Sequence, residues 1–476
     1  MAFLFHCFFT LLMVFLFSGK AYAESENKAE KQAKNINKTL SDKMNISKNK
    51  KIPSQKQSSL INLKVEKYSL DNGMVVLLHQ DRRIPQVYHQ LLVKIGSRDE
   101  EEGKTGLAHL FEHMMFRGTD KYTGEEYEER LEAIGARNNA FTSRDYTAYE
   151  VLLPSHKLEM ILEMESERLN SLRLTQSNFD KEKEVVKEER RLRTDNNPNE
   201  VFEPMMQLVF KSHPYRRPII GWMKDLEVMT LDDCKEFYQS YYAPNNAILV
   251  LAGDFELEKA KRWIQKYYGA LKRSQIREPH SYQEPNQIKQ RVSRIERAIS
   301  APTLAFAYKV PKAGEDGAYS LEILNRVLVS GESSWLHQLL VYEHKLALAV
   351  GGFYYGLKEA GIFLVFVRMA PGKSLEKAKQ LFLSEIKKTR FDKISETDLL
   401  KSSRSIMNDY ISAVKSLSGK ANSLSVNEAY FEDYRELFKD LDRYGQVTAQ
   451  TIKEQANLYL SDEKVSIVEL VPMGKK

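Results

Sequence analysis

Short runs of alternating or continuously apolar residues recur along the chain and predict strands, and longer runs with helical spacing separate them. Strands are expected at residues 74–78, 87–95 and 247–251, and a strand pair at 135–153. The run Leu70-Asp71-Asn72-Gly73-Met74 predicts a tight turn between the strand 74–78 and an earlier strand that begins near Val65. Helices are expected at residues 105–116 and 178–193, and the second of them is highly charged.

A weak internal repeat relates the two halves of the chain. Residues 234–251 and 452–468 each predict a helix, a turn and a closing strand. This predicts a duplicated α+β unit whose helices pack on one face of a mainly antiparallel sheet. The 476 residues suit two domains of about 200 residues each. We expect a first domain at residues 62–273, a polar linker with two prolines at 274–298, and a second, homologous domain at 299–476.

The N-terminus has the pattern of a targeting segment. Residues 3–19 are almost entirely apolar, and Ala21-Tyr22-Ala23 then matches the small-x-small site that signal peptidases cut. We expect a signal peptide at residues 1–23 and an exported protein, either periplasmic or secreted. Because no Lys or Arg precedes Lys20, an uncleaved membrane anchor is the alternative. Residues 24–61 are rich in Lys, Ser, Asn and Gln and predict a disordered polar tether.

Composition and charge exclude some classes of function. The net charge is only +6, and no basic stripe is interleaved with aromatic residues, so the chain does not resemble a nucleic-acid-binding protein. No segment after the signal is long and apolar enough to span a bilayer. Removal of the signal would leave Cys234 as the single cysteine, which excludes an intramolecular disulfide. Its place in an amphipathic segment, residues 231–237, predicts packing and not catalysis.

The strongest chemical signal is the segment 106–116, which contains His109, Glu112 and His113 in a largely apolar setting. Histidines four residues apart on a helix point to the same side, one turn apart. Two neutral imidazoles so placed can bind one zinc ion and leave an open position for water. Glu112 lies near the same face and can take a proton from that water and later deliver it to the leaving amine. A pair of solvated surface histidines is the competing interpretation, and the apolar neighbours argue against it.

At these residues the chain resembles the inverzincin metallopeptidases, whose His-x-x-Glu-His motif reverses the thermolysin order. This family includes the pitrilysins, the insulysins and the mitochondrial processing peptidases. The resemblance extends over nearly the whole chain after the signal, through Leu70-x-Asn72-Gly73, Gly96-Ser97-Arg98-x-Glu100, Thr105-Gly106-Leu107-Ala108-His109, Phe116-x-Gly118-Thr119, Asn139-Ala140-Phe141-Thr142, His213-Pro214-Tyr215 and Tyr242-x-Pro244-x-Asn246. The length is similar to that of the short, two-domain, dimeric branch. The resemblance implies a zinc endopeptidase subunit.

The resemblance also implies a third zinc ligand on a later helix. The matching stretch is residues 182–189, where the family pattern assigns the ligand to Glu189. The same pattern gives a supporting catalytic role to Glu182, two turns earlier on the same face. The residues alone do not choose among the carboxylates of this charged helix, and Glu188 is the alternative by a register shift of one. With Glu189, the two histidines would hold one Zn2+ per chain.

The family binds its peptide substrate along an edge strand. By resemblance, that strand contains Asn139, Ala140 and Phe141, and the peptide adds to it through backbone hydrogen bonds, which suits varied sequences. Without the resemblance, an ordinary buried strand would be the simpler interpretation.

The family's second domain normally supplies an Arg and a Tyr, seven residues apart, to the active site. The matching segment here, residues 336–350, is expected to be helical, and the two positions fall on Val341 and Leu348. Neither side chain can donate a hydrogen bond to a developing oxyanion. We therefore expect a heterodimer with a homologous subunit that supplies the Arg and the Tyr. A homodimer that uses other donors is the alternative.

Other interpretations of the chain are weaker. His337 and His344 lie seven apart on the same expected helix, but no acidic partner has motif spacing to them, so they predict ordinary residues and no second metal pair. A non-catalytic scaffold or binding subunit of the same fold competes with the peptidase, and a zinc amidase is a more distant alternative. The complete set of His109, Glu112, His113 and Glu189 favours the peptidase.

Overall fold

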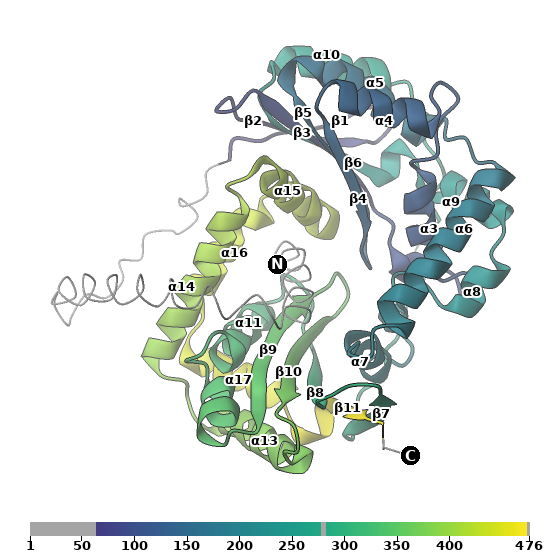
Figure 1. The fold of residues 1–476 in the computed structure, drawn as a ribbon. Coiled ribbons are helices and arrows are strands. Elements are labelled where there is room, and N and C mark those ends of the chain that lie inside the picture. Colours follow the sequence, from purple (N-terminus) through teal and green to yellow (C-terminus); the bar gives the residue numbers. More distant parts are fainter. Residues whose placement is uncertain (1–62, 278–281, 474–476) are drawn as a thin grey trace, which may run out of the picture.

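The computed structural model describes residues 63–277 and 282–473. The signal peptide and the tether expected at residues 1–61 lie outside these ranges. The described residues form two mixed, mostly antiparallel sheets, each with helices packed against it (Figure 1). The predicted α+β class is therefore confirmed.

The first sheet has six strands in the order β1-β2-β6-β3-β5-β4. They are β1 Glu66–Ser69, β2 Val75–Gln80, β3 Gln86–Val93, β4 Arg137–Thr142, β5 Thr147–Pro154 and β6 Ala247–Gly253. All neighbours run antiparallel except β2 and β6, which run parallel. The expected turn joins β1 to β2, and in it the Gly73 N–H donates to the Leu70 carbonyl (2.8 Å). The short strand β4 lies at the edge of this sheet.

The second sheet has five strands in the order β7-β11-β8-β10-β9. They are β7 Arg291–Arg297, β8 Thr303–Val310, β9 Ala347–Gly356, β10 Gly361–Met369 and β11 Val465–Pro472. Again one pair, β7 and β11, runs parallel. The order matches that of β2-β6-β3-β5-β4, so the two sheets repeat one topology. The strand β7 falls inside the segment 274–298 that we expected to be a linker.

The helices follow the same repeat. Those of the first half are α3 Leu107–Met114, α4 Gly124–Ala133, α5 Leu158–Asn170, α6 Gln176–Arg190, α7 Phe202–Val209, α8 Met223–Val228, α9 Leu231–Tyr241 and α10 Leu257–Tyr268. Those of the second half are α11 Asp316–Val329, α12 Trp335–His337, α13 Leu375–Phe391, α14 Glu396–Ala413, α15 Leu417–Phe431, α16 Glu436–Gln446 and α17 Ala449–Tyr459. In each half a helix leads into a closing strand, α9 into β6 and α17 into β11, as the sequence repeat predicts.

Two helices differ in length from the prediction. The helix α3 is shorter than the expected 105–116, because Gly106 has a φ of 91° and turns the chain just before Leu107. A Cβ at Gly106 would lie only 2.4 Å from the Ile220 carbonyl oxygen, so the turn requires glycine. The expected helix 178–193 is α6, followed by a π turn, η4, at Arg191–Asp195.

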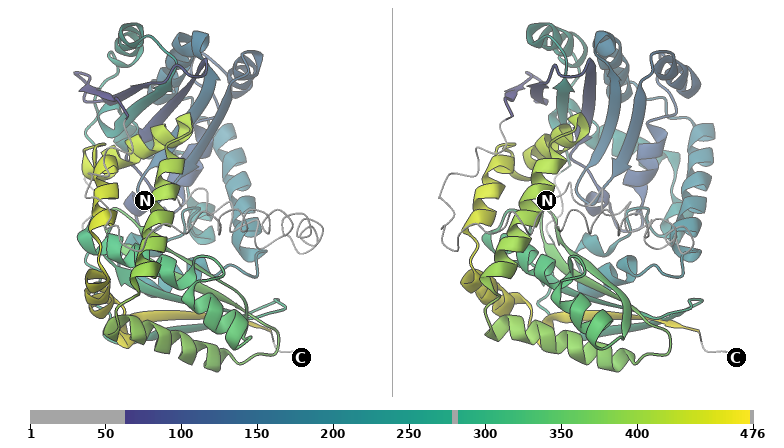
Figure 2. Two further views of the ribbon diagram at one scale, coloured as in Figure 1. Left: turned by 90° about the vertical axis from the view of Figure 1, so that its left-hand side faces the viewer. Right: turned by 60° about the vertical axis from the view of Figure 1, so that its left-hand side comes forward.

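Each sheet is covered on both faces, and one face of each is covered by the other half of the chain. Alternate residues of a strand point to opposite faces. In the first sheet, Val76 and Leu91 belong to the core formed with the first half's own helices. Leu77 and Leu92 belong to the core formed with the second half, whose helix α15 packs on β6 and β3 (Figures 1 and 2).

The helix α7 makes the reciprocal contact, from the first half to the second sheet. It belongs to the first half but packs on β8 and β11 of the second sheet, where Met205 and Met206 share a core with Ala305 and Leu364. The prediction that helices cover one face of each sheet therefore holds only for the helices of the same half. The sequence pattern could not reveal the rest, because both α7 and α15 lie far along the chain from the sheet that they cover.

The helix expected at 336–350 is shorter than predicted, because the helical residues end at Glu343. The chain forms α12 and then a π turn, η7, at Gln338–Glu343, after which Lys345 adopts a φ of 50°. From Ala347 the chain continues as strand β9. His337 and His344 therefore do not share one helix.

Two smaller expectations concern the membrane and the cysteine. Within residues 63–277 and 282–473, no helix has the length and apolar character that crossing a bilayer requires. Cys234 is buried in α9, and its burial raises the pKa of the thiol to about 12. It therefore packs as an apolar residue, as predicted.

Candidate metal centre

The helix α3 carries both histidines of the motif. Its other side is anchored in the core of the first half, where Leu110, Phe111 and Met114 are fully buried. The rings of His109 and His113 lie on one side of the helix, with their centroids 4.9 Å apart. The four-residue spacing predicted this arrangement.

A buried carboxylate holds the N-terminus of α3. Glu100 accepts the Gly106 N–H through Oε2 and the Ala108 N–H through Oε1, both at 2.9 Å. The first N–H groups of a helix have no partner within the helix and carry its positive end, so a carboxylate is well placed there. Burial raises the pKa of Glu100 to about 8 against the opposing effect of these N–H groups. Glu100 lies in the motif Gly96-Ser97-Arg98-x-Glu100, from which no role for it was predicted. The signal was an acidic residue shortly before a helix that begins at a glycine.

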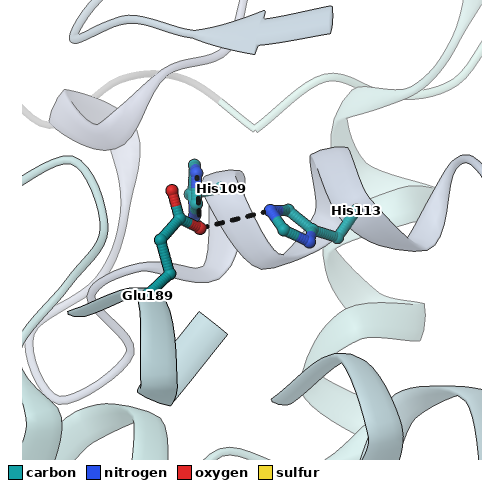
Figure 3. A group of neighbouring side chains, drawn as sticks. All are labelled: His109, His113 and Glu189. Carbon is teal, nitrogen blue, oxygen red and sulfur yellow. Dashed lines mark ion pairs between the residues drawn. The ribbon is translucent and has the colours of Figure 1, made fainter. Parts of the chain in front are cut away.

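Three side chains converge on one point from two helices. His109, His113 and Glu189 each offer a ligand atom, and these atoms all lie within 4.8 Å of one another. Figure 3 shows the Glu189 carboxylate facing both imidazoles. The Oε2 atom of Glu189 is 3.8 Å from His109 Nε2 and 3.5 Å from His113 Nε2. No other such group occurs among the residues that the structure describes.

The register of α6 separates Glu189 from its neighbour. The Glu188 side chain is 56% exposed and pairs with Arg191 at 3.1 Å, away from the histidines. The second oxygen of Glu189, Oε1, forms an ion pair with Arg193 at 2.5 Å. Arg193 lies in the π turn η4, which brings its guanidinium back towards α6. One carboxylate oxygen of Glu189 is thus fixed by Arg193 while the other faces the imidazoles.

Glu182 lies behind His113. Its side chain is almost fully buried, and its Oε2 accepts a hydrogen bond from His113 Nδ1 (3.3 Å). Its Oε1 forms an ion pair with Arg117 Nη2 (2.7 Å). The bond to Nδ1 fixes the tautomer of the ring and leaves Nε2 directed at Glu189. Glu182 therefore orients the imidazole and does not reach the common point itself.

Burial and charge move the pKa values of the two histidines in opposite directions. Burial lowers the pKa of His109 to about 3, so this ring is neutral at neutral pH. Burial would also lower the pKa of His113, but Glu182 and Glu189 raise it to about 9. Burial would raise the pKa of Glu189, yet His113, His109 and Arg193 lower it to about 2. The group thus combines a negative carboxylate, a neutral imidazole and an imidazole whose proton a cation can displace.

Glu112 lies beside this group and is held by strand β4. The Thr142 hydroxyl, at the end of β4, donates to Glu112 Oε2 (2.5 Å). Burial raises the pKa of the Glu112 carboxyl, and the bond from Thr142 and the proximity of His113 lower it. A carboxyl with a raised pKa is suited to accept and return a proton near neutral pH.

Comparison with known proteins gives the family. A family model described as Insulinase (Peptidase family M16) matches residues 75–222, and one described as Peptidase M16 inactive domain matches residues 229–405. A Helicobacter pylori protein named Zinc protease PqqE is 30% identical over 419 residues, which cover 86% of this chain and 93% of that protein. The chain belongs to peptidase family M16.

Solved structures agree with this assignment. A crystal structure of a protease from Helicobacter pylori superposes on this M16 chain with a TM-score of 0.81 at 29% identity, covering 86% of this chain and 100% of that one. The periplasmic protease PqqL from Escherichia coli gives a TM-score of 0.71 at 21% identity, covering 86% of this chain and 47% of that one. At that identity the second likeness shows the fold alone. A relative from Rickettsia felis, 25% identical over 402 residues, is also named a zinc protease. The resemblance to the metallopeptidase family is confirmed.

The strand that the resemblance singles out lies next to the metal centre of this M16 member. Asn139, Ala140 and Phe141 are in β4, which packs beside α3 and pairs with β5 on one side. Asn139 is exposed, and Ala140 and Phe141 are half-buried. In the part of the chain that the structure describes, β4 is an edge strand and not a central, fully buried one.

The remaining histidines of the second half lie away from any such group. His337 ends α12, and its ring lies 5.3 Å from that of Tyr342. His344 is exposed after η7. Neither belongs to the cluster of potential ligands in the described residues.

Proposed function

We propose that this M16 chain is the zinc-holding subunit of an endopeptidase that hydrolyses peptides or unfolded protein segments. One observation carries the proposal. His109, His113 and Glu189 converge beside Glu112, which is itself hydrogen-bonded to the end of the edge strand β4. A metal group, an acid–base carboxylate and a strand that can pair with a peptide are the three parts that such a reaction needs.

The chemistry of the three ligands fits zinc. In zinc proteins, imidazole nitrogen and carboxylate oxygen lie about 2.0–2.2 Å from the metal. Two ligand atoms of a tetrahedral site are therefore about 3.3–3.6 Å apart. The separations of 3.5 and 3.8 Å from Glu189 to the two histidines are close to that span. Within residues 63–277 and 282–473 no protein group bonds to Nδ1 of buried His109, and its Nε2 faces Glu189 Oε2. A zinc ion held by this set would supply Lewis-acid chemistry and activate water near neutral pH.

Glu112 is the proton carrier in this proposal. It would take a proton from the attacking water and deliver it to the nitrogen of the leaving amine. The Thr142 hydroxyl occupies one of its two oxygens and so directs the other. Glu182 supports the reaction by holding His113 through Nδ1, as its contacts suggest.

Substrate would bind as an added strand on β4. The backbone of Asn139, Ala140 and Phe141 would pair with an extended peptide, which places a scissile bond near the end of the strand where Glu112 lies. Backbone pairing accepts many sequences, so the proposal includes broad selectivity along the chain and requires an unfolded segment.

A homologous partner would complete the site. Val341, in η7, is half-buried, and Leu348, in β9, is 52% exposed. Neither can donate a hydrogen bond to the oxyanion that forms during peptide hydrolysis. We therefore propose a heterodimer in which a similar chain without the His-x-x-Glu-His motif supplies an Arg and a Tyr. A homodimer with other donors is the alternative.

Export is part of the proposal. It rests on the sequence of residues 1–23, and the periplasmic location of the Escherichia coli relative is consistent with it. Secretion of the protein together with cleavage after Ala23, read from the N-terminal sequence of the mature protein, would establish it. A mature protein that begins at Met1 would favour the membrane-anchor alternative.

The test of the activity combines metal analysis with peptide hydrolysis. We expect one zinc per chain, loss of activity on chelation, and recovery when zinc is added. Glu112→Gln should keep its zinc but lose activity by at least about 100-fold, because the ligands stay and the proton carrier is lost. A folded native protein without zinc would refute the proposal. Wild-type protein that holds zinc but cleaves no peptide, with or without partners, would favour the scaffold alternative.

The test of the partner uses the zinc-loaded chain alone and with its homologous subunit. Strong stimulation of peptide cleavage by the partner would support the divided site. Full activity of the isolated chain would exclude the heterodimer model.

A further inference from the structure

A buried aspartate lies three residues beyond the hydroxyl that holds Glu112. Asp145 is in the turn between β4 and β5, and its side chain is completely buried. Such a carboxylate needs full hydrogen bonding to remain stable inside the protein. Its partners come from both halves of the chain, whereas the rest of the metal centre comes from the first half alone.

The two oxygens of Asp145 are divided between the halves. Oδ1 accepts from Arg98 Nη1 (2.9 Å) and from the Tyr215 hydroxyl (2.6 Å), both of the first half. Oδ2 accepts from the Tyr430 hydroxyl (2.8 Å) and from the Lys358 backbone N–H (3.2 Å), both of the second half. Tyr430 lies in α15, the helix that covers the first sheet. One carboxylate thus bonds to both halves at the turn.

The turn is held by hydrogen bonds among its own residues. The Ser143 N–H donates to the Tyr146 carbonyl (2.8 Å), and the Ser143 hydroxyl accepts the N–H groups of Asp145 and Tyr146. On the outer side, a Cβ at Gly96 would lie 2.5 Å from the Arg144 carbonyl, so the backbone there is in close contact. Thr142 directly precedes the turn and donates to Glu112.

We propose that Asp145 is a positioning residue through which the second half of the chain sets the place of the Thr142 hydroxyl and thereby of the Glu112 carboxylate. The proposal rests on the peptidase function proposed above. It gives α15 a role in the reaction in addition to its role in covering the first sheet. Deletion of one oxygen atom, that of the Tyr430 hydroxyl, removes a bond between the second half and Asp145. The Tyr430 ring also packs edge-on against Tyr146.

The test compares two hydroxyl deletions on α15. Tyr430→Phe removes the bond to Asp145. Ser425→Ala removes a matched bond, because the Ser425 hydroxyl donates to Gln90 Oε1 (2.5 Å), a buried residue of β3 in the first half. Gln90 has no contact with the turn after β4 among the described bonds. For each variant we would measure zinc content, kcat, KM and the exchange of the backbone amides at 143–146, adding the partner subunit if the wild type needs it.

We expect Tyr430→Phe to lower kcat about fivefold or more, with KM and zinc content within about twofold of the wild type, since a displaced catalytic group slows the chemical step. Its amides at 143–146 should exchange faster. Ser425→Ala should leave kcat and these amides unchanged. In a Thr142→Val background, Tyr430→Phe should have no further effect on kcat, because the path to Glu112 is already cut.

Several outcomes would overturn the proposal. Equal losses of kcat in Tyr430→Phe and Ser425→Ala would mean that general loosening of the interface is responsible. Additive effects of Tyr430→Phe and Thr142→Val would mean that the path does not run through Thr142. A wild type without peptidase activity would refute the proposed function separately, and the amide exchange would then still decide whether Asp145 couples α15 to the turn.

Discussion

The helix that carries the histidines and its counterpart in the second half occupy the same place in the repeat. α3 follows β3, and α11 follows the equivalent strand β8. Their surroundings differ. At α3 the ligand group reaches the surface, since the side chains of His113 and Glu189 are 24% and 22% exposed. At α11 nearly every residue is buried, between the second sheet and the helices α14 and α17.

The carboxylates of the two regions have different partners. Beside α3, Glu182 and Glu189 meet imidazole and guanidinium groups. Around α11, Asp440 accepts the hydroxyls of Tyr319 and Tyr410 and also pairs with Arg443 (3.3 Å), and Glu322 of α11 accepts the hydroxyl of Tyr444 (2.6 Å). Tyrosine hydroxyls stay protonated and hold a carboxylate in place. Imidazoles can exchange a proton for a metal ion. One topology thus supports a reactive polar group in one half and a structural one in the other.

The largest effect that separates the regions is expected at the third ligand. Glu189→Gln should reduce zinc affinity by more than the roughly 10- to 100-fold that an outer partner contributes, because a neutral amide replaces a charged ligand. Glu188→Gln, on the adjacent exposed residue, should retain zinc. Competition with a chromogenic chelator measures both. Equal retention would mean that the register of α6 in the site is wrong.

A smaller loss is expected at the residue behind His113. Glu182→Gln should lower zinc affinity by about 10- to 100-fold, since the amide orients the ring less strongly than the carboxylate. Glu184 lies on the same helix, is exposed and pairs only with Lys187 in the described contacts, so Glu184→Gln is the matched control. Affinity unchanged in both variants would remove Glu182 from the metal centre.

In the second half, the corresponding change should affect stability and not the metal. Asp440→Asn should lower the free energy of unfolding by about 1–3 kcal/mol, because one tyrosine hydroxyl loses its acceptor inside the protein and Arg443 loses its charged partner. Zinc content should remain that of the wild type. Asp392→Asn, at an exposed position, provides the control and should change stability by less than about 0.5 kcal/mol. Zinc loss in Asp440→Asn would contradict the distinction between the two regions.

The smallest expected effect concerns acid. His89 is fully buried in β3, and burial lowers its pKa to about 4. Unfolded histidine binds a proton below about pH 6.5 but the folded ring does not, so the first half loses stability as the pH falls from 6.5 towards 4. Between pH 6 and pH 5 this amounts to about 1 kcal/mol.

The variant His89→Gln should remove this part of the pH dependence. Its unfolding free energy, measured by denaturant titration at each pH, should fall less than that of the wild type on going from pH 6 to pH 5. Peptide-level hydrogen exchange should show the acid effect in the first half, because His337 and His344 of the second half are not buried. Identical pH slopes for variant and wild type would refute the role of His89.

Local signals predicted much of the first half. The turn at Leu70–Gly73, the strands around it and the histidine helix all depend on neighbours within a few residues, and the structure contains them. The place of Glu189 facing the histidines came from family resemblance and not from spacing, since the charged helix offered several carboxylates.

The failures share a physical cause. Residues 336–350 have an apolar pattern that fits either a helix or a buried strand, and the sheet decides in favour of β9 from Ala347 onward. The bond from Thr142 to Glu112 and the bonds of Asp145 to both halves join segments that only the tertiary fold brings together. No periodicity in the sequence records them.

The packing of α15 on the first sheet also determines when that sheet can be fully covered during synthesis. All strands of the first sheet have been made once residue 253 is added, but one of its apolar faces waits for residues 417–431. At about 5–20 residues per second, a ribosome needs on the order of ten seconds or more to add the intervening chain. A first sheet that formed during that interval would carry an uncovered apolar surface, the kind of surface that chaperones bind and that aggregates when they are absent.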